Sequence, residues 1–227
     1  MDRTDRRPWC AARIAAALAA GALVTGPAPA RAVPLISEVF YDAVGSDDGL
    51  SFVELYGAPG APLDGLIVEG VNGADGKVYA SLKLAGSIGP DGLFVLADKT
   101  AAGSSSVAGA DQLLNFDLQN GPDSVVLRDG VTDTVLDAMG YGDFQAGTFF
   151  AGEGTPAPGV AAGSSLARRF ANIDSGDNAA DWIELAVPTP HAAPVAPVPE
   201  PSSAALSMAG LVGLAVARRK RRACATR

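Results

Sequence analysis

Short hydrophobic runs that alternate with polar residues repeat along the middle of the chain, from residue 33 to residue 187. Most are separated by Gly together with Asp, Asn or Pro, which favour turns. No stretch keeps a helical period over about ten residues, so the pattern predicts an all-β fold, an antiparallel sandwich. The predicted strands are 35–41, 51–56, 66–71, 78–84, 93–97, 124–128, 134–141, 165–169 and 182–186.

Alternation within one run, SFVELYG, assigns its side chains to two faces. Glu54 shares one face with two aromatic residues, whereas Val53 and Leu55 share the other. One face is expected to enter the core, with Glu54 at the rim or exposed. The segments 101–110 and 145–162 have no strand pattern and are expected to be mobile surface loops.

Residues 1–32 have the parts of a secretory signal peptide in the usual order. Four arginines lead into an apolar run at 14–24, and Ala30 and Ala32 frame an A-x-A cleavage site. The mature protein is therefore expected to begin near Val33. A buried N-terminal helix is the alternative, but it would not explain why the three parts stand in this order.

The other end of the chain has five parts. Residues 188–198 are rich in proline and predict an extended spacer of about 30 Å. A Pro-Glu-Pro box then precedes an apolar run at 202–217, five basic residues and a tail at 223–227. A bilayer needs roughly 20 helical residues, so the run predicts a short transmembrane helix. The box is Pro199, Glu200 and Pro201, and the basic cluster is Arg218, Arg219, Lys220, Arg221 and Arg222.

The two ends predict the same topology. Basic residues after an apolar span stay on the cytoplasmic side of the membrane. The signal peptide directs the chain to the general secretory translocon, so the domain is expected outside and the tail inside.

The box, the apolar run and the basic cluster together resemble the PEP-CTERM sorting signal of exopolysaccharide-producing Gram-negative bacteria. The resemblance covers Val198 to Arg222, with the signal itself at 199–222. It implies that a membrane-embedded exosortase recognises the box and processes the protein near it, so that the anchor in the inner membrane is transient. An ordinary tail anchor, the alternative, would leave the Pro-Glu-Pro box unexplained.

Several runs of the middle region are similar to the lamin-tail domain in its bacterial secreted form. They include LISEVFYDAVGSDDGLSFVELYG, DGLFVLAD, VLDAMGYGD and DSGDNAADW, in that order. The resemblance spans Leu35 to Pro190 and implies an immunoglobulin-like antiparallel β-sandwich for the domain at 33–187. Two positions depart from the family: Ile67 stands where a Trp is frequent, and His191 where a Gly is common.

The region expected to be exported is strongly acidic. Between residues 33 and 199, six basic residues stand against 22 acidic ones, which gives a net charge of −16. This balance argues against nucleic acid as a partner. Both cysteines, Cys10 and Cys224, lie outside the region, so it can form neither a disulfide nor a thiolate metal site.

Enzymatic activity is not expected. The chain has one histidine, His191, and the sequence places it in the proline-rich spacer rather than in the core. A Ser-His-Asp triad and a histidine zinc site therefore lack their central residue. A glycosidase would need a cleft lined by aromatic residues, and one of the two Trp residues lies in the signal peptide.

Calcium is the one candidate cofactor, because hard oxygen ligands on loops suit this ion. The candidate ligands form the pattern D-x-x-D-N-x-x-D near the last strand, although the spacing does not match an EF-hand. The alternative is that these residues form turns and keep the surface soluble. The candidates are Asp174, Asp177, Asn178 and Asp181.

The sequence thus predicts a non-enzymatic exported protein of the cell surface or extracellular matrix. Its sandwich is expected to have a structural or adhesive role in the exopolysaccharide matrix of a biofilm. The expected partners are exosortase, the translocon, the inner membrane transiently, and exopolysaccharide or another surface protein. The alternative is an accessory module that recruits an extracellular enzyme or another partner protein.

Overall fold

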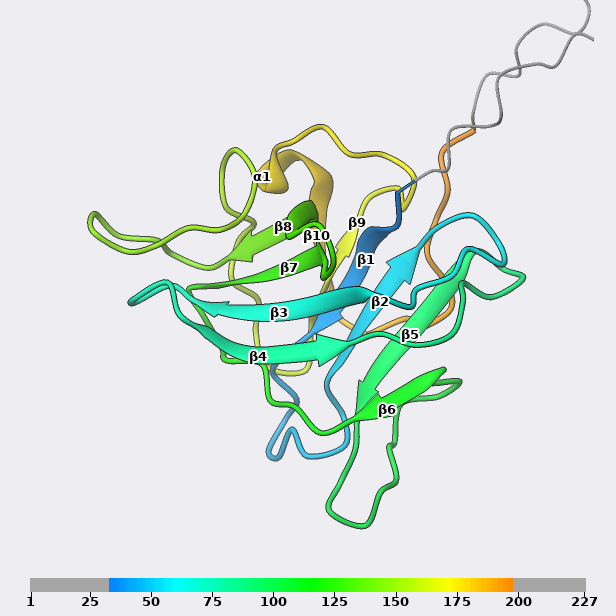
Figure 1. Ribbon diagram of the computed structural model, residues 1–227. Coiled ribbons are helices and arrows are strands. Elements are labelled where there is room, and N and C mark those ends of the chain that lie inside the picture. The colour runs from blue at the N-terminus through cyan, green and yellow to red at the C-terminus, as the bar shows by residue number, and fades with distance from the viewer. Residues whose placement is uncertain (1–32, 198–227) are drawn as a thin grey trace, which may run out of the picture. The chain divides into compact units, whose positions relative to one another are not determined.

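The computed structural model describes residues 33–197 of the 227-residue chain (Figure 1). Ten strands and one short helix account for its regular structure. The elements are β1 Leu35–Phe40, β2 Phe52–Tyr56, β3 Leu66–Asn72, β4 Val78–Lys83, β5 Leu93–Asp98, β6 Gln112–Leu114, β7 Asp123–Asp129, β8 Thr134–Tyr141, β9 Ser165–Arg168, α1 Asn178–Asp181 and β10 Trp182–Leu185.

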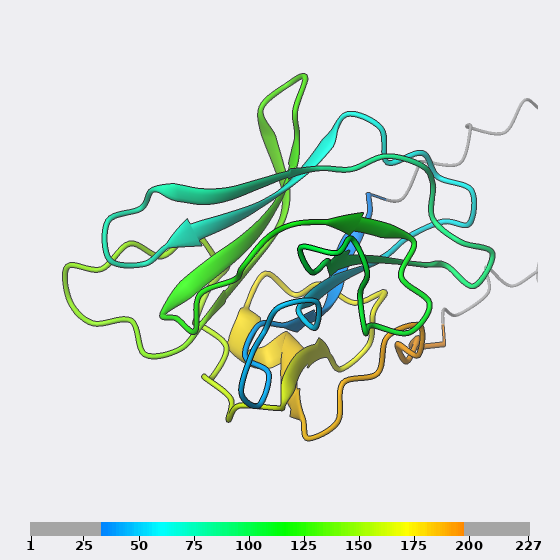
Figure 2. The same cartoon turned by 90° about the horizontal axis from the view of Figure 1, so that it is seen from below.

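The strands form two sheets that pack against each other (Figures 1 and 2). One sheet has the order β10-β9-β1-β2-β5-β6, and the other the order β4-β3-β7-β8. The main core joins side chains of both, such as Val53 and Leu96 from the first sheet and Val68 and Leu127 from the second. The all-β, two-sheet prediction is therefore confirmed. The antiparallel prediction holds for every strand pair of the described residues except β5–β6, which is parallel.

All nine predicted strands are present, with ends that shift by at most one residue. The sequence missed β6, whose three residues are all half-buried and too few to show an alternation. It also missed α1, a single turn that Asp177 caps by accepting a hydrogen bond from the Ala179 N–H. Within residues 33–197, no helix is long and apolar enough to span a bilayer.

The expected surface loop at 101–110 covers the outer face of the six-stranded sheet. Phe40 and Phe52 form a second hydrophobic cluster on this face, and Val107 and Ala110 pack over it. The segment is held in place by the Ser106 N–H, which donates to the carbonyl of Gly49. The sheet is thus buried on both faces, and this explains why β5 is fully buried along its length.

The expected spacer does not stand clear of the domain. Residues 188–197, which we call the strap, run along the outer face of the same sheet and hydrogen-bond to it. Glu54, expected at the rim or exposed, has no exposed surface because the strap lies over it. The strap makes a turn at residues 189–192, closed by the Ala192 N–H donating to the Thr189 carbonyl, and its prolines have no N–H to donate, so it is held by its side chains and remaining amides.

Candidate functional site

A buried arginine joins the two sheets at one end of the sandwich. Arg168, on β9, is 1% exposed. Its Nη2 lies 2.6 Å from Asp137 Oδ1 on β8, its Nη1 lies 3.0 Å from Asp181 Oδ2, and its Nε donates to the Ile36 carbonyl at 2.8 Å. The guanidinium also lies 5.1 Å from the ring centre of Trp182. Arg168 therefore ties β1, β8, β9 and α1 together, and each of its nitrogens has a partner.

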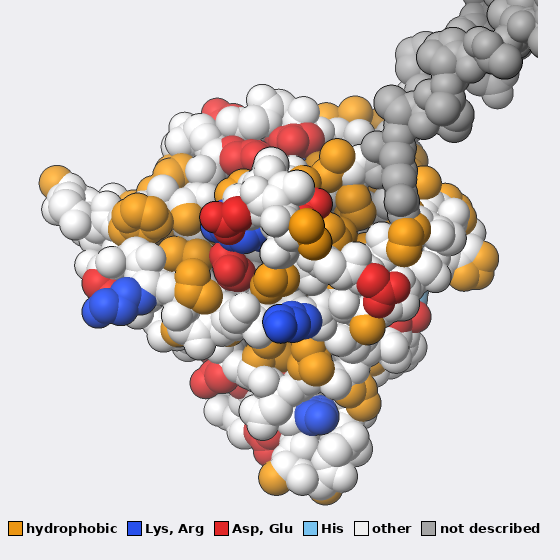
Figure 3. Space-filling model, in the orientation of Figure 1, with side chains coloured by type: hydrophobic (Ala, Val, Ile, Leu, Met, Phe, Trp, Pro, Cys, Tyr) orange, Lys and Arg blue, Asp and Glu red, His pale blue; other side chains and the backbone are white. Residues whose placement is uncertain are grey.

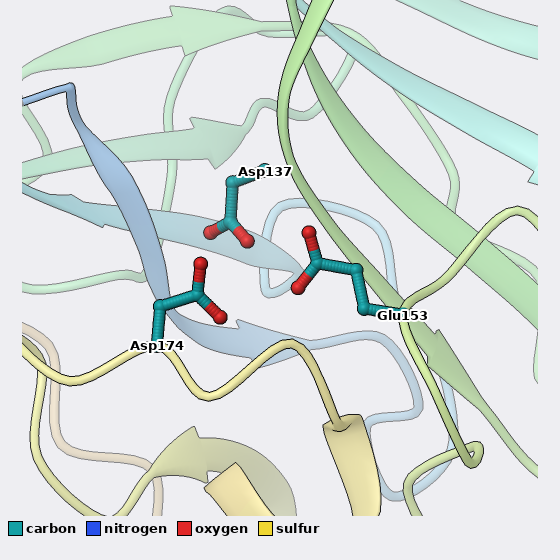
Figure 4. A group of neighbouring side chains, drawn as sticks. All are labelled: Asp137, Glu153 and Asp174. Carbon is teal, nitrogen blue, oxygen red and sulfur yellow. The ribbon is translucent and has the colours of Figure 1, made fainter.

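Three carboxylates point toward one another, as Figure 4 shows, and two of them lie within 3.5 Å of Arg168. Asp137, Glu153 and Asp174 each present an oxygen, and the three oxygens lie within 4.8 Å of one another. Burial, followed by the charges of Asp137 and Asp174, raises the pKa of Glu153 to about 7. Burial also raises the pKa of Asp137, although Arg168 opposes the shift. We call these three residues and Arg168 the arginine cluster.

The arginine cluster is better suited to holding a proton than a metal ion. Arg168 contacts Asp137 and also lies 3.5 Å from Asp174, so one positive charge already offsets part of the negative charge of this site. A divalent cation would be repelled by the guanidinium. Glu153, with its raised pKa, can instead carry a proton at neutral pH and relieve the remaining negative charge.

The four residues predicted as calcium ligands do not converge on one point. Asp177 caps α1 and accepts from the Thr155 N–H, and Asp181 binds Arg168 and the hydroxyl of Ser175. Asn178 is fully buried, and it makes hydrogen bonds to the backbone of residues 138, 140 and 153. Of the four, Asp174 alone lies in the carboxylate trio.

Sequence reasoning missed two members of the trio. Asp137 lies within a predicted strand, and Glu153 lies in a segment rich in Gly, Ala and Pro. Neither stands close to Asp174 in the chain, and the fold alone brings them together. Inward-facing charge within a predicted strand, at Asp137, was the only local signal that could have indicated a buried ion pair.

A second acidic region forms an open hollow of about 300 Å³ near the first turn. Both oxygens of Asp98 accept backbone hydrogen bonds there, from Gly49 and from Phe116. Burial and the charges of Asp47 and Asp98 raise the pKa of Asp117. The hollow is lined by Ser46, Asp47, Asp48, Asp98, Asn115, Phe116 and Asp117.

Two buried glutamates hold the strap. Glu38 and Glu54 lie opposite each other on β1 and β2 and are 1% and 0% exposed. Glu38 accepts from the backbone N–H and the hydroxyl of Thr189 at 2.9 and 3.0 Å, and Glu54 accepts from the His191 N–H at 2.6 Å. We call these four residues the clasp. The remaining acceptor positions are used by the hydroxyls of Ser165 and Ser37.

The clasp contains no arginine or lysine. Burial therefore raises the pKa of Glu54 to about 7, despite the hydrogen bonds from Ser37 and His191, and nearby Glu38 adds to the shift. The His191 ring bonds to Asp91 Oδ2 at 3.0 Å and to the Gly109 carbonyl at 2.8 Å. Burial opposes a charge on this ring, but the Gly109 and Asp91 acceptors outweigh it, and the pKa of His191 is raised.

The residues predicted for sorting and anchoring lie outside the described part of the chain. They are the cleavage-site residues Ala30 and Ala32, the box Pro199, Glu200 and Pro201, the apolar run 202–217, and the basic cluster Arg218, Arg219, Lys220, Arg221 and Arg222.

Comparison with known families detects one motif in the chain. A family model described as the PEP-CTERM protein-sorting motif matches residues 197–222. The predicted sorting signal is thereby confirmed, and with it an exported protein that is sorted at the membrane through its C-terminus. No family match supports the expected resemblance to the lamin-tail domain. No curated protein and no solved structure matches the chain.

Proposed function

We propose that this chain is a non-enzymatic cargo protein that exosortase sorts and processes for the cell surface or the extracellular matrix. The observation that carries the proposal is the match to the PEP-CTERM motif at residues 197–222. The motif begins where the hydrogen-bonded part of the strap ends, at Ala196. The protein therefore consists of a folded domain followed directly by a sorting signal.

The two ends of the chain would direct the steps of export in this proposal. The signal peptide at 1–32 would bring the chain to the translocon, and the apolar run at 202–217 would hold it transiently in the inner membrane. The basic cluster at 218–222 would then stay on the cytoplasmic side. Processing near the box would release the acidic domain from this anchor.

The interactions of the histidine support a role without catalysis. Both ring nitrogens of His191, the only histidine of the chain, bond to acceptors that fasten the strap. A histidine used in this way is not free to act as a general base. The buried carboxylates of Glu38, Glu54 and Asp137 also have structural partners.

The domain itself would serve a structural or adhesive role, as a lamin-tail-like, immunoglobulin-like sandwich. Two packed sheets and a net charge of −16 between residues 33 and 199 support a stable, soluble module. On the face in Figure 3, acidic and hydrophobic side chains are intermixed and the basic ones lie apart from one another. Such a face favours a neutral glycan or a protein over a polyanion.

Intact mass of the protein recovered from its native host tests the proposal. We expect a mass that lacks residues 1–32 and the residues beyond the box, and an unprocessed form in a host without exosortase. The matched control is Glu200→Gln, which keeps the size of the side chain and removes the charge of the box. A mature protein that retains Arg218 to Arg227 in the complete host would contradict sorting by exosortase.

A pull-down from secreted matrix distinguishes the two expected roles of the domain. Recovery of polysaccharide with the domain would support the structural or adhesive role. Recovery of one protein in stoichiometric amount would support the accessory module that recruits a partner.

A further inference from the structure

The strap is fastened at a third place beyond the clasp and the His191 ring. The Ala171 N–H donates to the carbonyl of Pro194 at 2.8 Å. The side chain of Asn172 makes two hydrogen bonds to the backbone of Ala196. Its Oδ1 accepts from the Ala196 N–H at 2.7 Å, and its Nδ2 donates to the Ala196 carbonyl at 3.0 Å. The bonded part of the strap therefore continues to the residue before the PEP-CTERM match.

The partners of the strap come from parts of the chain that are far apart in sequence. Glu38 and Glu54 lie on β1 and β2, Asp91 and Gly109 flank β5, and Asn172 follows β9. These groups meet only when the six-stranded sheet is assembled. The strap can therefore dock only on a folded domain.

Docking leaves little chain between the domain and the sorting box. From Ala196 to Pro199 there are three residues, which span at most about 11 Å. The domain has a radius of gyration of about 15 Å for its size. An enzyme that grips the box from the membrane would therefore meet the body of the domain. With the strap detached, the chain from Val187 to Pro199, which is twelve residue steps long, would reach about 40 Å.

We propose that the strap is a gate for processing: while the strap is docked, the three residues after Ala196 limit how far the sorting box can reach from the folded domain, and detachment of the strap gives a membrane-embedded enzyme access to it. This inference rests on the proposed sorting by exosortase. Detachment exposes Glu38 and Glu54 to water and frees the His191 ring, so the strength of these contacts sets the fraction of open molecules. Processing then occurs at a rate proportional to this fraction.

Two changes are expected to give the enzyme access to the box. One weakens the docking of the strap, and the other leaves the strap docked but lengthens the chain that follows it. The double variant Thr189→Val with His191→Ala removes the Thr189 hydroxyl and the His191 ring from the contacts of the strap. Insertion of a flexible Gly/Ser segment of about ten residues between Pro197 and Val198 leaves every described contact in place but lengthens the reach of the box. The matched control is Val195→Ala, because this side chain is 49% exposed and belongs to the same strap.

Pulse-chase labelling in the native host, read by intact mass, measures the rate of processing of each full-length variant. We expect the double variant to be processed roughly five- to thirty-fold faster than the wild type, as expected for the loss of a few hydrogen bonds. The insertion variant should also be faster, and Val195→Ala should match the wild type. A folded double variant, or the insertion variant, processed at the wild-type rate would overturn the gate.

Failure of the gate and failure of the sorting proposal give different results. The sorting proposal falls if the wild type is processed at the same rate without exosortase. It also falls if the Glu200→Gln variant is processed at the wild-type rate. If processing requires both exosortase and Glu200, but its rate does not change when the strap is altered, only the gate proposal falls. Should the double variant fail to fold, the insertion variant decides, because it leaves residues 33–197 unchanged.

Discussion

The arginine cluster and the clasp both bury carboxylates, but they neutralise them differently. In the arginine cluster, the guanidinium of Arg168 lies 2.6 Å from Asp137 and 3.0 Å from Asp181. In the clasp, Glu38 and Glu54 receive hydrogen bonds from hydroxyls and backbone amides, and the closest cation is a histidine ring at the surface. The guanidinium of Arg168 keeps its charge at every pH at which the protein folds, although Glu153 beside it titrates near neutral pH, whereas the clasp has no permanent positive charge.

The two sites also differ in which parts of the protein they hold together. Arg168 and its partners come from both sheets, so breaking the cluster disrupts the sandwich. The clasp joins the sheet to a segment at the end of the domain, so it can open without separating the strands. The ion pair of Arg168 thus lies between the two sheets, whereas the clasp joins one sheet to the strap.

The largest effect is expected from Arg168→Met. The substitution keeps an unbranched side chain but leaves Asp137 and Asp181 buried without their cation. We expect the free energy of unfolding to fall by about 3–5 kcal/mol, measured by urea denaturation. The matched control is Arg169→Met at the neighbouring exposed position, which should cost less than about 1 kcal/mol. Equal effects of the two substitutions would contradict the role of Arg168.

Asn178→Ala should have the next largest effect. Its amide bonds to the backbone of residues 138, 140 and 153, and the substitution leaves these buried groups without partners. We expect a loss of about 2–3 kcal/mol of unfolding free energy, with or without calcium. A loss seen only in the presence of calcium would instead support Asn178 as a metal ligand.

The clasp is expected to make the stability of the protein depend on pH, and this effect should be smaller than those of the two substitutions. In the folded protein the pKa of Glu54 is raised from 4.5 to about 7, so the folded state binds this proton more tightly than the unfolded state. The free energy of unfolding therefore falls as the pH rises from about 4.5 to about 7. The pKa of Glu153, also raised to about 7, lowers the free energy of unfolding over the same pH range. The raised pKa of His191 extends this loss of stability to higher pH.

Urea denaturation at pH 5.5 and pH 8 measures this dependence. We expect the protein to be about 1–3 kcal/mol more stable at the lower pH. Glu54→Gln should reduce the difference, since the amide does not titrate in this range. The exposed Glu184→Gln serves as the control and should leave the difference unchanged. A wild-type protein that is more stable at pH 8 would contradict the raised pKa of Glu54.

The smallest effect is expected from calcium. Because Arg168 supplies the positive charge beside Asp137 and Asp174, we expect millimolar calcium to shift the melting temperature by less than about 1 °C. Isothermal calorimetry should give a flat titration. Binding that is lost in Asp174→Asn would show that the trio takes a metal ion despite the arginine.

The sequence predicted the β-rich architecture because each strand carries its own hydrophobic alternation and its own turn residues. Apart from the short elements β6 and α1, what it missed depends on distant contacts. Nothing near Glu54 in the chain indicates that residues 188–197 cover it, and nothing near Asp174 indicates Asp137 or Glu153. The D-x-x-D-N-x-x-D pattern is real, but its residues cap a helix, bridge backbone groups and bind Arg168.

The proline-rich segment is the most informative difference. Its composition predicts an extended spacer, but the segment contains a turn at residues 189–192, closed by the Ala192 N–H donating to the Thr189 carbonyl, and it is docked on the sheet. The deciding groups are the carboxylates of β1 and β2, about 140 residues away in sequence, and Asn172. The gate depends on this docking more than on any other feature of the domain.

Amide hydrogen exchange of the full-length protein, read by mass spectrometry on peptides from residues 187–197, tests the docking most directly. The amides of Thr189, His191 and Ala196 donate to Glu38, Glu54 and Asn172. We expect these peptides to exchange far more slowly than an unstructured chain, and to lose protection in the Thr189→Val, His191→Ala variant. Exchange at the rate of an unstructured chain in the wild type would show a free spacer and contradict the docked strap.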